Sequence, residues 1–352
     1  MPMLAEQVDV VIGVDTHKDT HTAAVVTAAT GAVLAEKTVT ADPEGYAELI
    51  ELGHAHGVLR AWAIEGANGY GAGLHATLAA AGELVCELDR PVRPARRAGA
   101  KSDPIDAVRA ARDALARTRL GSPRSGPERA ALQVLLSARR AAVDAATQAR
   151  NQLQALIVTA PEQVRARFRG HKTDAMITTA LRLRVTRTAG IEVATTTTTL
   201  KAIARRIRAL DSEATAHEAA IKKIVASWRP DLLTVRGVGP IVAAVVLTAW
   251  SHSGRCRDDG AFAMLAGTAP IPASSGKTVR HRLNRSGDRQ LNRAIHTVVR
   301  SRLRWDPETR AYVERRQAQH KTDREIRRCL TRYVTRQLYR QLENPTPPHH
   351  SA

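Results

Sequence analysis

The chain has 352 residues, which is enough for two or three domains with cores of their own. Lys and Arg outnumber Asp and Glu by 53 to 34, and the formal net charge of +19 makes nucleic acid the first candidate partner. The three cysteines are far apart and lie in no CxxC or Cys/His ligand spacing, so the sequence suggests neither a disulfide framework nor a structural zinc site.

The sequence also indicates where the protein acts. Its first ten residues, MPMLAEQVDV, lack the basic and then apolar pattern of a signal peptide, and the most apolar stretch, 240–250, is too short to span a bilayer. We therefore expect no membrane contact and a cytoplasmic, nucleoid-associated protein of bacterial type. Aromatic residues make up only 3% of the chain, so contacts with nucleic acid should come from Arg, Lys and backbone groups.

Residues 1–120 predict one α/β domain. Strands are expected at 8–14, 21–27, 32–38, 59–64 and 84–88, and helices at 43–55, 71–81 and 104–117. Three strands joined by short turns, followed by alternating helices and strands, is the order of a ribonuclease H-like sheet. That sheet commonly carries acidic metal sites.

Four carboxylates fall where such a sheet would gather them at one edge. Asp15 ends the first strand and Glu65 ends the fourth, whereas Asp103 and Asp106 lie three residues apart at the start of a helix. Clustered carboxylates repel one another unless cations neutralise them, and such oxygen ligands suit Mg²⁺ or Mn²⁺ held together with substrate phosphates. The pattern predicts a site for two Mg²⁺ ions, with Mn²⁺ as a substitute, that acts on a phosphodiester.

Each carboxylate also has a structural interpretation. Asp103 precedes a proline and would serve as a helix N-cap, which Asp106 could support. Asp15 could close a hairpin, and Glu65 could be a solvated strand end. The occurrence of all four acids in this order favours the metal site.

Residues 121–229 predict a helical middle region. A first long helix is expected from 127 to about 158, with an apolar seam that Arg139 and Arg150 interrupt. A second has a heptad seam at Leu200, Ile203, Ile207, Leu210, Ala214, His217, Ile221, Ile224 and Trp228. The basic segment 161–199 separates them, and its threonine run, 195–199, is a poor helix former. Two alternatives stay open, namely a helical hairpin within one chain or a coiled-coil contact between protomers.

Residues 230–342 predict a mostly helical C-terminal domain, and 343–352 a disordered tail. The motif GVGP lies between two apolar stretches and resembles the turn of a helix-hairpin-helix element. In such an element Gly237 and Gly239 would let backbone N–H groups approach a DNA phosphate. The alternative is an ordinary glycine turn.

A serine in this domain is a candidate nucleophile. Ser275 stands in a turn bounded by glycine and proline, PIPASSGKTVRHR, ahead of a dense basic run. Its hydroxyl could attack phosphorus if a metal or a base activated it, while the basic run held neighbouring phosphates through Lys277, Arg280, Arg282 and Arg285. A serine in a turn is more often structural.

The arrangement as a whole resembles the IS110 family of insertion-sequence transposases, which are related to the Piv-type DNA invertases. In the N-terminal half the resemblance lies in VIGVDTHKDTHTAAVV, AIEGANGYGAGL and RRAGAKSDPIDAVRAA. In the C-terminal half it lies in LLTVRGVGPIVAAVVL and FAMLAGTAPIPASSGKTVRHRLNRSGDRQLNRAI. It implies a RuvC-like DEDD domain whose metal-binding acids are Asp15, Glu65, Asp103 and Asp106. In the C-terminal transposase domain, the nucleophile would be the serine before a glycine, Ser275, with Ser274 as the neighbouring alternative.

The resemblance also implies a mechanism and partners. Members of the family are recombinases in which a serine forms a transient phosphoserine link to DNA, helped by the metals of the DEDD domain, before strands are exchanged and rejoined. A noncoding bridge RNA selects the double-stranded donor and target DNA. The protein is expected to be a homo-oligomer, a tetramer, in which the serine of one protomer is completed by the DEDD domain of another.

Other functions fit part of the pattern. A Holliday-junction nuclease of RuvC type shares the acids and the fold, but it needs no C-terminal serine and hydrolyses DNA without a covalent intermediate. An ATPase of the actin and sugar-kinase class also opens on a strand with Asp, yet the sequence has no second phosphate loop of that class. A catalytically inactive nucleic-acid-binding protein would suit the charge, although all four acids and Ser275 are present.

Overall fold

The computed structural model describes residues 3–88, 102–274 and 281–345. The chain divides into two compact units, Met1–Ser125 and Gly126–Ala352. The second unit contains both the expected helical middle region and the expected C-terminal domain. Within the described ranges, no helix combines the length and the apolarity that crossing a bilayer requires.

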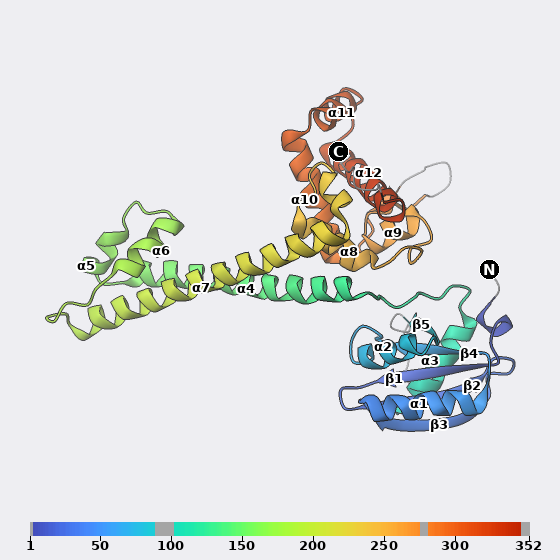
Figure 1. Ribbon diagram of the computed structural model, residues 1–352. Coiled ribbons are helices and arrows are strands. Elements are labelled where there is room, and N and C mark those ends of the chain that lie inside the picture. The colour runs from blue at the N-terminus through green and yellow to red at the C-terminus, as the bar shows by residue number, and fades with distance from the viewer. Residues whose placement is uncertain (1–2, 89–101, 275–280, 346–352) are drawn as a thin grey trace, which may run out of the picture. The chain divides into compact units, whose positions relative to one another are not determined.

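The N-terminal unit is a five-stranded mixed sheet with helices packed on it (Figure 1). After a short 3-10 helix, η1 (Leu4–Glu6), its elements are β1 (Val10–Thr16), β2 (Thr20–Thr27), β3 (Val33–Thr40), α1 (Pro43–His56), β4 (Arg60–Glu65), α2 (Ala72–Ala80), β5 (Leu84–Leu88) and α3 (Asp103–Ala116). These elements agree in kind and order with the sequence-based prediction. The mixed α/β architecture is therefore confirmed.

The strand order is β3-β2-β1-β4-β5. β1 pairs antiparallel with β2, and β2 with β3, whereas β1, β4 and β5 run parallel to one another. Val14 of β1 is in register with Ile64 of β4. The next residues along these strands, Asp15 and Glu65, therefore lie side by side at the carboxyl edge of the parallel strands.

The two faces of the sheet bury different helices. Ile12 and Val14 of β1 belong to a core that includes Leu49 of α1 and Leu74 of α2. Val11, which points the opposite way, belongs to a core formed with alanines of α3. This alternation follows from the two-residue period of a strand, and it separates α1 and α2 from α3.

The second unit is mostly helical, as the sequence predicts. Its elements are α4 (Pro127–Thr159), α5 (Glu162–Arg165), η2 (Ala166–Phe168), α6 (Thr173–Arg182), α7 (Ile191–Trp228), η3 (Pro230–Thr234), α8 (Pro240–Trp250), α9 (Asp259–Leu265), β6 (Ile271–Pro272), β7 (His281–Arg282), α10 (Arg289–Trp305), α11 (Pro307–Ala318) and α12 (Asp323–Glu343). Of the tail expected at 343–352, residues 346–352 lie outside the described residues.

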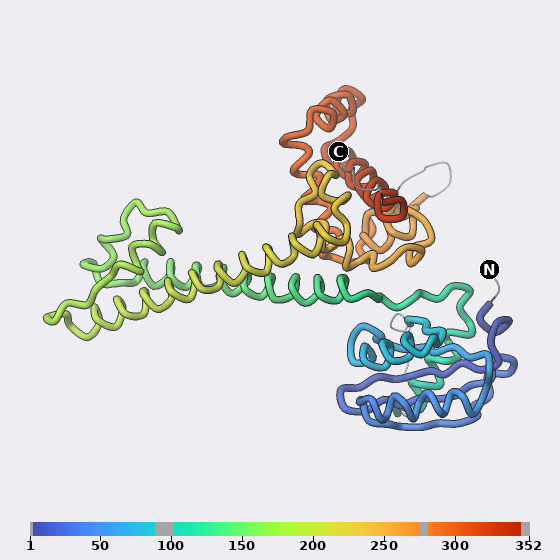
Figure 2. The backbone as a smooth tube through the Cα atoms, viewed as in Figure 1, coloured from blue at the N-terminus to red at the C-terminus, as the bar shows by residue number. Residues whose placement is uncertain are grey.

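The long helices α4 and α7 lie side by side as a hairpin within the chain, with α5 and α6 at its far end (Figure 2). At the base, Leu132 of α4 and Ile221 of α7 share a core with α8, α10 and α12. At the far end, Leu153 of α4 and Ile207 of α7 share a second core with α6. The apolar seams therefore meet inside one chain, and a contact between protomers stays a prediction.

The two arginines that interrupt the α4 seam also find partners on α7. Arg139 lies 2.9 Å from a carboxylate oxygen of Glu218, and Arg150 lies 2.7 Å from one of Asp211. All four side chains are partly exposed, so each pair contributes on the order of 1 kcal/mol or less. The two ion pairs contribute little to stability, and their main effect is to specify which residues of α4 and α7 lie opposite each other.

The beginning of α7 differs from the sequence-based expectation. The threonine run 195–199 is a poor helix former, yet the helix starts at Ile191 and includes the whole run. Thr197 is buried, and the Thr198 hydroxyl donates to the Ala194 carbonyl at 3.0 Å. Packing against α6 outweighs the weak intrinsic propensity of threonine.

The GVGP motif forms a tight turn between η3 and α8. Gly237 has a φ of +83°, and a Cβ at this position would lie 3.3 Å from the Val298 carbonyl oxygen of α10. Gly239 is the N-cap of α8, and Pro240 is the first residue of that helix. The element before the turn is a short 3-10 helix where a helix-hairpin-helix unit would have an α-helix. The positive φ and the close contact with α10 are reasons for a glycine at 237 that do not involve DNA.

Two isoleucines of α7 differ in burial, which gives a test of the helical hairpin. Ile221 is fully buried, whereas Ile191 is 87% exposed. We expect Ile221→Ala to lower the free energy of unfolding of the helical unit by about 2–5 kcal/mol because it leaves a cavity. The control Ile191→Ala should change it by less than about 0.5 kcal/mol. Urea unfolding followed by circular dichroism measures both. An unchanged unfolding curve for Ile221→Ala, together with a smaller assembly in light scattering, would instead mean that α7 pairs between protomers.

Candidate metal centre

The fold directs two of the predicted acids to one face of the sheet. Val11 of β1 and Ala63 of β4 pack against α3. Asp15 lies four residues after Val11, and Glu65 lies two residues after Ala63, so both continue the row that faces α3. The strand register sets them beside each other at the carboxyl end.

The other two acids lie in the first turn of α3. Helical spacing places Asp103 and Asp106 on the side of Ala107 and Ala110, which are buried against the sheet. β1 comes very close to this helix at Gly13, where a Cβ would lie 2.0 Å from the Ala107 carbonyl oxygen. Because Gly13 has no side chain, the first turn of α3 can approach the end of β1.

The result is a cluster of three possible ligands. Asp15, His17 and Asp103 each offer one ligand atom, and these atoms lie within 4.8 Å of one another. His17 Nε2 is 3.3 Å from a carboxylate oxygen of Asp15 and 3.4 Å from one of Asp103. The Asp15 side chain is 16% exposed, whereas His17 and Asp103 are about half exposed, so the cluster is open to a substrate from solvent.

Two of the structural alternatives for these acids are wrong. The N-cap of α3 is Ser102, and Asp103 is the first residue of the helix, so capping does not account for Asp103. β1 continues through Thr16, and so Asp15 belongs to the strand and does not close the hairpin. Both carboxylates are therefore available for another role.

Asp106 and Glu65 stand at the margin of the cluster. Asp106 pairs with Arg109, one helical turn further along α3. The Thr16 hydroxyl donates to the Glu65 backbone carbonyl at 2.9 Å, which ties the ends of β1 and β4 together. In the part of the chain that the structure describes, neither acid is among the three groups that converge.

The electrostatics of Asp15 favour a cation at this place. Burial raises the pKa of the Asp15 carboxyl above its usual value. The nearby His17 lowers it, and the negative charges of Asp103 and Asp106 raise it further. The charged carboxylate is thus disfavoured unless positive charge is added. Two carboxylates and one imidazole form a donor set that fits a divalent cation, so the residues present suit the expected metal.

His17 is a site residue that the sequence analysis missed. It follows Asp15 by two residues in VDTHK and is the first residue after β1, where a continued two-residue period would put it on the same face as Asp15. That spacing was the available signal.

The serine segment is described only at its two ends. Ser275, Lys277 and Arg280 lie outside the described residues, whereas Ser274 is exposed. Ile271 of β6 pairs with Arg282 of β7, so the short strands hold the two ends of the segment next to each other. Arg282 and Arg285 are exposed.

A cavity of about 920 Å³ opens beside these strands. Among the described residues that line it, two are acids, Asp288 and Glu325. The cationic side chains that line it are Arg282, Arg285, Arg289, Arg316, Lys321, Arg328 and Arg332. This excess of positive charge suits the phosphates of a nucleic acid. The sequence alone identified Arg282 and Arg285, but it did not predict that α11 and α12 lie next to them.

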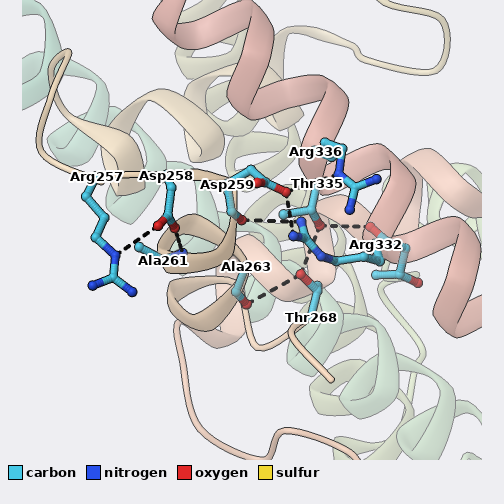
Figure 3. Close-up of polar contacts among 10 residues, drawn as sticks. Arg257, Asp258, Asp259, Ala261, Ala263, Thr268, Arg332, Thr335 and Arg336 are labelled. Atoms are coloured by element: carbon cyan, nitrogen blue, oxygen red, sulfur yellow. Dashed lines mark hydrogen bonds and ion pairs between the residues drawn. The ribbon is translucent and has the colours of Figure 1, made fainter. Parts of the chain in front are cut away.

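A polar network anchors the chain that leads into β6 (Figure 3). Asp259 of α9 forms ion pairs with Arg332 and, at 3.1 Å, with Arg336, both on α12. The Thr268 and Thr335 hydroxyls lie 3.0 Å apart. Arg332 also lines the cavity. The network therefore connects the residues that precede β6 with the cationic side chains of the cavity.

Two family models match the sequence. One covers the DEDD domain of IS110 transposases, is described as "Transposase", and matches residues 12–161. The other is described as "Transposase IS116/IS110/IS902 family" and matches residues 230–314. The first range contains Asp15, His17, Glu65, Asp103 and Asp106, and the second contains Ser275.

A relative from Streptomyces coelicolor (strain ATCC BAA-471 / A3(2) / M145) is also similar. This protein, named "Insertion element IS110 uncharacterized 43.6 kDa protein", is 29% identical over 147 residues. The aligned stretch is 41% of this chain and 36% of the relative, so most of that relative is not matched.

Proposed function

The chain belongs to the IS110 family of transposases, and from that membership we propose that it cuts and rejoins DNA as the recombinase of an insertion sequence. The observation that carries the proposal is the convergence of Asp15 and Asp103, which come from a strand end and a helix start far apart in the sequence. The strand order β3-β2-β1-β4-β5, with its single parallel set, further supports a ribonuclease H-like or RuvC-like DEDD domain.

The four acids would hold the metal ions in this proposal. Asp15 and Asp103 would be ligands at the centre of the site, with Glu65 and Asp106 at its margin. Bound Mg²⁺ or Mn²⁺ would neutralise charge that develops on the oxygens of the phosphodiester. Of the chain's own groups, Asp15 is fixed by β1 and Asp103 by the close packing of α3, so the ligands are oriented before substrate binds.

Ser275 would be the nucleophile. Its hydroxyl oxygen attacks phosphorus and loses its proton, a phosphoserine ester forms, and the bond from phosphorus to the leaving strand oxygen breaks. That oxygen takes up a proton and becomes a hydroxyl. In rejoining, the hydroxyl of the exchanged strand attacks the phosphoserine and releases the serine, so no external energy source is needed.

Basic groups of the helical unit would hold the DNA backbone during these steps. Lys277, Arg280, Arg282 and Arg285 belong to the serine segment or to its flank, and the described members line the cationic cavity. Backbone N–H groups near Gly237 and Gly239 are a further contact for a phosphate. The scarcity of aromatic residues agrees with contacts to phosphates rather than stacking on bases.

The proposed partners are double-stranded donor and target DNA together with a noncoding bridge RNA that selects both. The formal charge of +19 supports binding to nucleic acid. We further propose a tetramer in which the DEDD domain of one protomer and the serine of another together form an active site.

A Holliday-junction nuclease of RuvC type is the second candidate, because the strand order and the acid cluster support it equally. The match of residues 230–314 to a transposase model favours recombination, since a nuclease needs no such segment.

An assay with purified components tests the proposal. The protein is incubated with donor DNA, target DNA, Mg²⁺ or Mn²⁺ and the RNA transcribed from the noncoding DNA beside the gene. We expect recombinant junctions, read by sequencing, that disappear when EDTA removes the metal or when the RNA is omitted. A parallel incubation replaces the donor and target DNA with a synthetic four-way junction. Nicking of that junction, without recombinant products in the first incubation, would support the nuclease instead.

A further inference from the structure

Hydrogen bonds of His17 and of the residue before it position the His17 backbone at the metal centre. Its N–H donates to the Thr20 carbonyl at 3.0 Å, which closes the turn between β1 and β2. The preceding residue, Thr16, donates its hydroxyl to the Glu65 carbonyl at 2.9 Å. Because β1 is joined in this way to both neighbouring strands, the imidazole reaches Asp15 and Asp103 from a fixed base.

The distances around Nε2 are those of neighbouring ligands on one ion. Two donor atoms in adjacent positions of an octahedral ion with bonds of about 2.1 Å lie about 3 Å apart. Nε2 lies 3.3 Å from the Asp15 oxygen and 3.4 Å from the Asp103 oxygen. A small movement of half-exposed side chains would bring all three atoms to one cation.

We propose that His17 is a nitrogen ligand of the cation held by Asp15 and Asp103, and that it makes this site prefer Mn²⁺ to Mg²⁺. The inference rests on the metal centre of the proposed function and adds a ligand and a selectivity to it. Mg²⁺ is a hard ion that takes oxygen ligands and retains its waters. Mn²⁺ also suits carboxylates, but it belongs to the first-row transition series, in which it is the weakest binder of nitrogen ligands. Mn²⁺ accepts both kinds of ligand present here.

The competing explanation is that His17 acts only in the metal-free protein. A protonated imidazole between two carboxylates would neutralise them, and an incoming cation would then displace it. The two explanations differ in whether nitrogen is bound to the metal, so the state of the loaded site decides between them.

Electron paramagnetic resonance of Mn²⁺ gives that answer without any measurement of activity. The full chain is labelled with ¹⁵N-histidine and titrated with Mn²⁺, and loss of the free-ion signal measures the affinity. Electron spin-echo modulation then detects nitrogen bound to the ion. Competition by added Mg²⁺ gives the ratio of the two affinities. We expect ¹⁵N modulation and a preference for Mn²⁺.

Three variants complete the test. His17→Ala should lose the nitrogen signal and weaken Mn²⁺ binding by at least about tenfold, with a smaller effect on Mg²⁺. His54→Ala is the matched control, because His54 has a similar exposure, 57% against 48% for His17, and lies 3.7 Å from a carboxylate, Glu83. Glu83 pairs with Arg60, at the other end of β4 from Glu65. Asp15→Asn should weaken the binding of both ions.

The outcomes separate the inference from the proposed function. Unchanged binding of both ions to Asp15→Asn would overturn the metal centre itself. If Asp15→Asn lost binding but His17→Ala kept its Mn²⁺ affinity, or if the wild-type protein gave no ¹⁵N modulation, only the role of His17 would be overturned. An equal loss of Mn²⁺ and Mg²⁺ in His17→Ala would likewise contradict the selectivity.

Discussion

Asp15→Asn is expected to abolish DNA strand cleavage while leaving the N-terminal unit folded. Asparagine keeps the size of the side chain and removes the charge that would bind metal, and loss of a metal ligand commonly costs several kcal/mol of transition-state stabilisation. That corresponds to a decrease in rate of about 10³-fold or more. Since burial already disfavours the charged form of Asp15, thermal unfolding should occur at the same temperature or higher.

The measurement is a gel assay of cleaved DNA, with circular dichroism to monitor folding. Asp19→Asn is the matched control, because Asp19 is an exposed carboxylate only four residues further along the same hairpin. It should retain full cleavage. Cleavage by Asp15→Asn at the wild-type rate in Mg²⁺ would remove Asp15 from the metal site.

Ser275→Ala is expected to lose recombination completely, together with any covalent link between protein and DNA. The wild-type protein, incubated with RNA and a suicide DNA substrate, should form an adduct that is stable in denaturant and maps by mass spectrometry to the peptide containing Ser275. Alanine has no oxygen with which to attack phosphorus. The effect should therefore be as large as that of losing the metal.

Ser274→Ala serves as the control, since the neighbouring hydroxyl differs by one position in the chain. It should retain both the adduct and the recombinant products. Asp15→Asn should form no adduct, because a placed hydroxyl and an activated phosphate are needed together. If the wild-type protein formed no adduct and Ser275→Ala still cut at the normal sites, hydrolysis by a nuclease of RuvC type would be the better account.

Much of the N-terminal unit was predictable because its signals are local. The apolar runs of β1 and β4 marked both as buried strands, and the positions of Asp15 and Glu65 at the strand ends put the two acids at one edge of the sheet. The approach of Asp103 was predictable only in outline. It depends on the absence of a Cβ at Gly13, a feature whose consequence is visible only when α3 has been placed.

The helical unit was less predictable because its decisive contacts are distant in sequence. The seams of α4 and α7 fit a pairing within or between chains equally well, and only the shared cores at Ile207 and Ile221 place both seams inside one chain. The threonines at 195–199 are helical because of tertiary packing, which intrinsic helix propensities do not take into account. The cationic cavity likewise needs α10, α11 and α12 in position.

The close crossing of α3 over β1 makes the interior of the N-terminal unit part of its chemistry. The helix rests directly on the backbone at Gly13, so one packing distance also sets the separation between Asp15 and Asp103. A methyl group added at Gly13 would push α3 away from β1 and so increase the distance between Asp15 and Asp103, although neither residue would itself be changed. Enlarging one of the smallest core residues of this unit is therefore expected to disturb the metal site as replacing an acid would, although the acidic motif itself would stay intact.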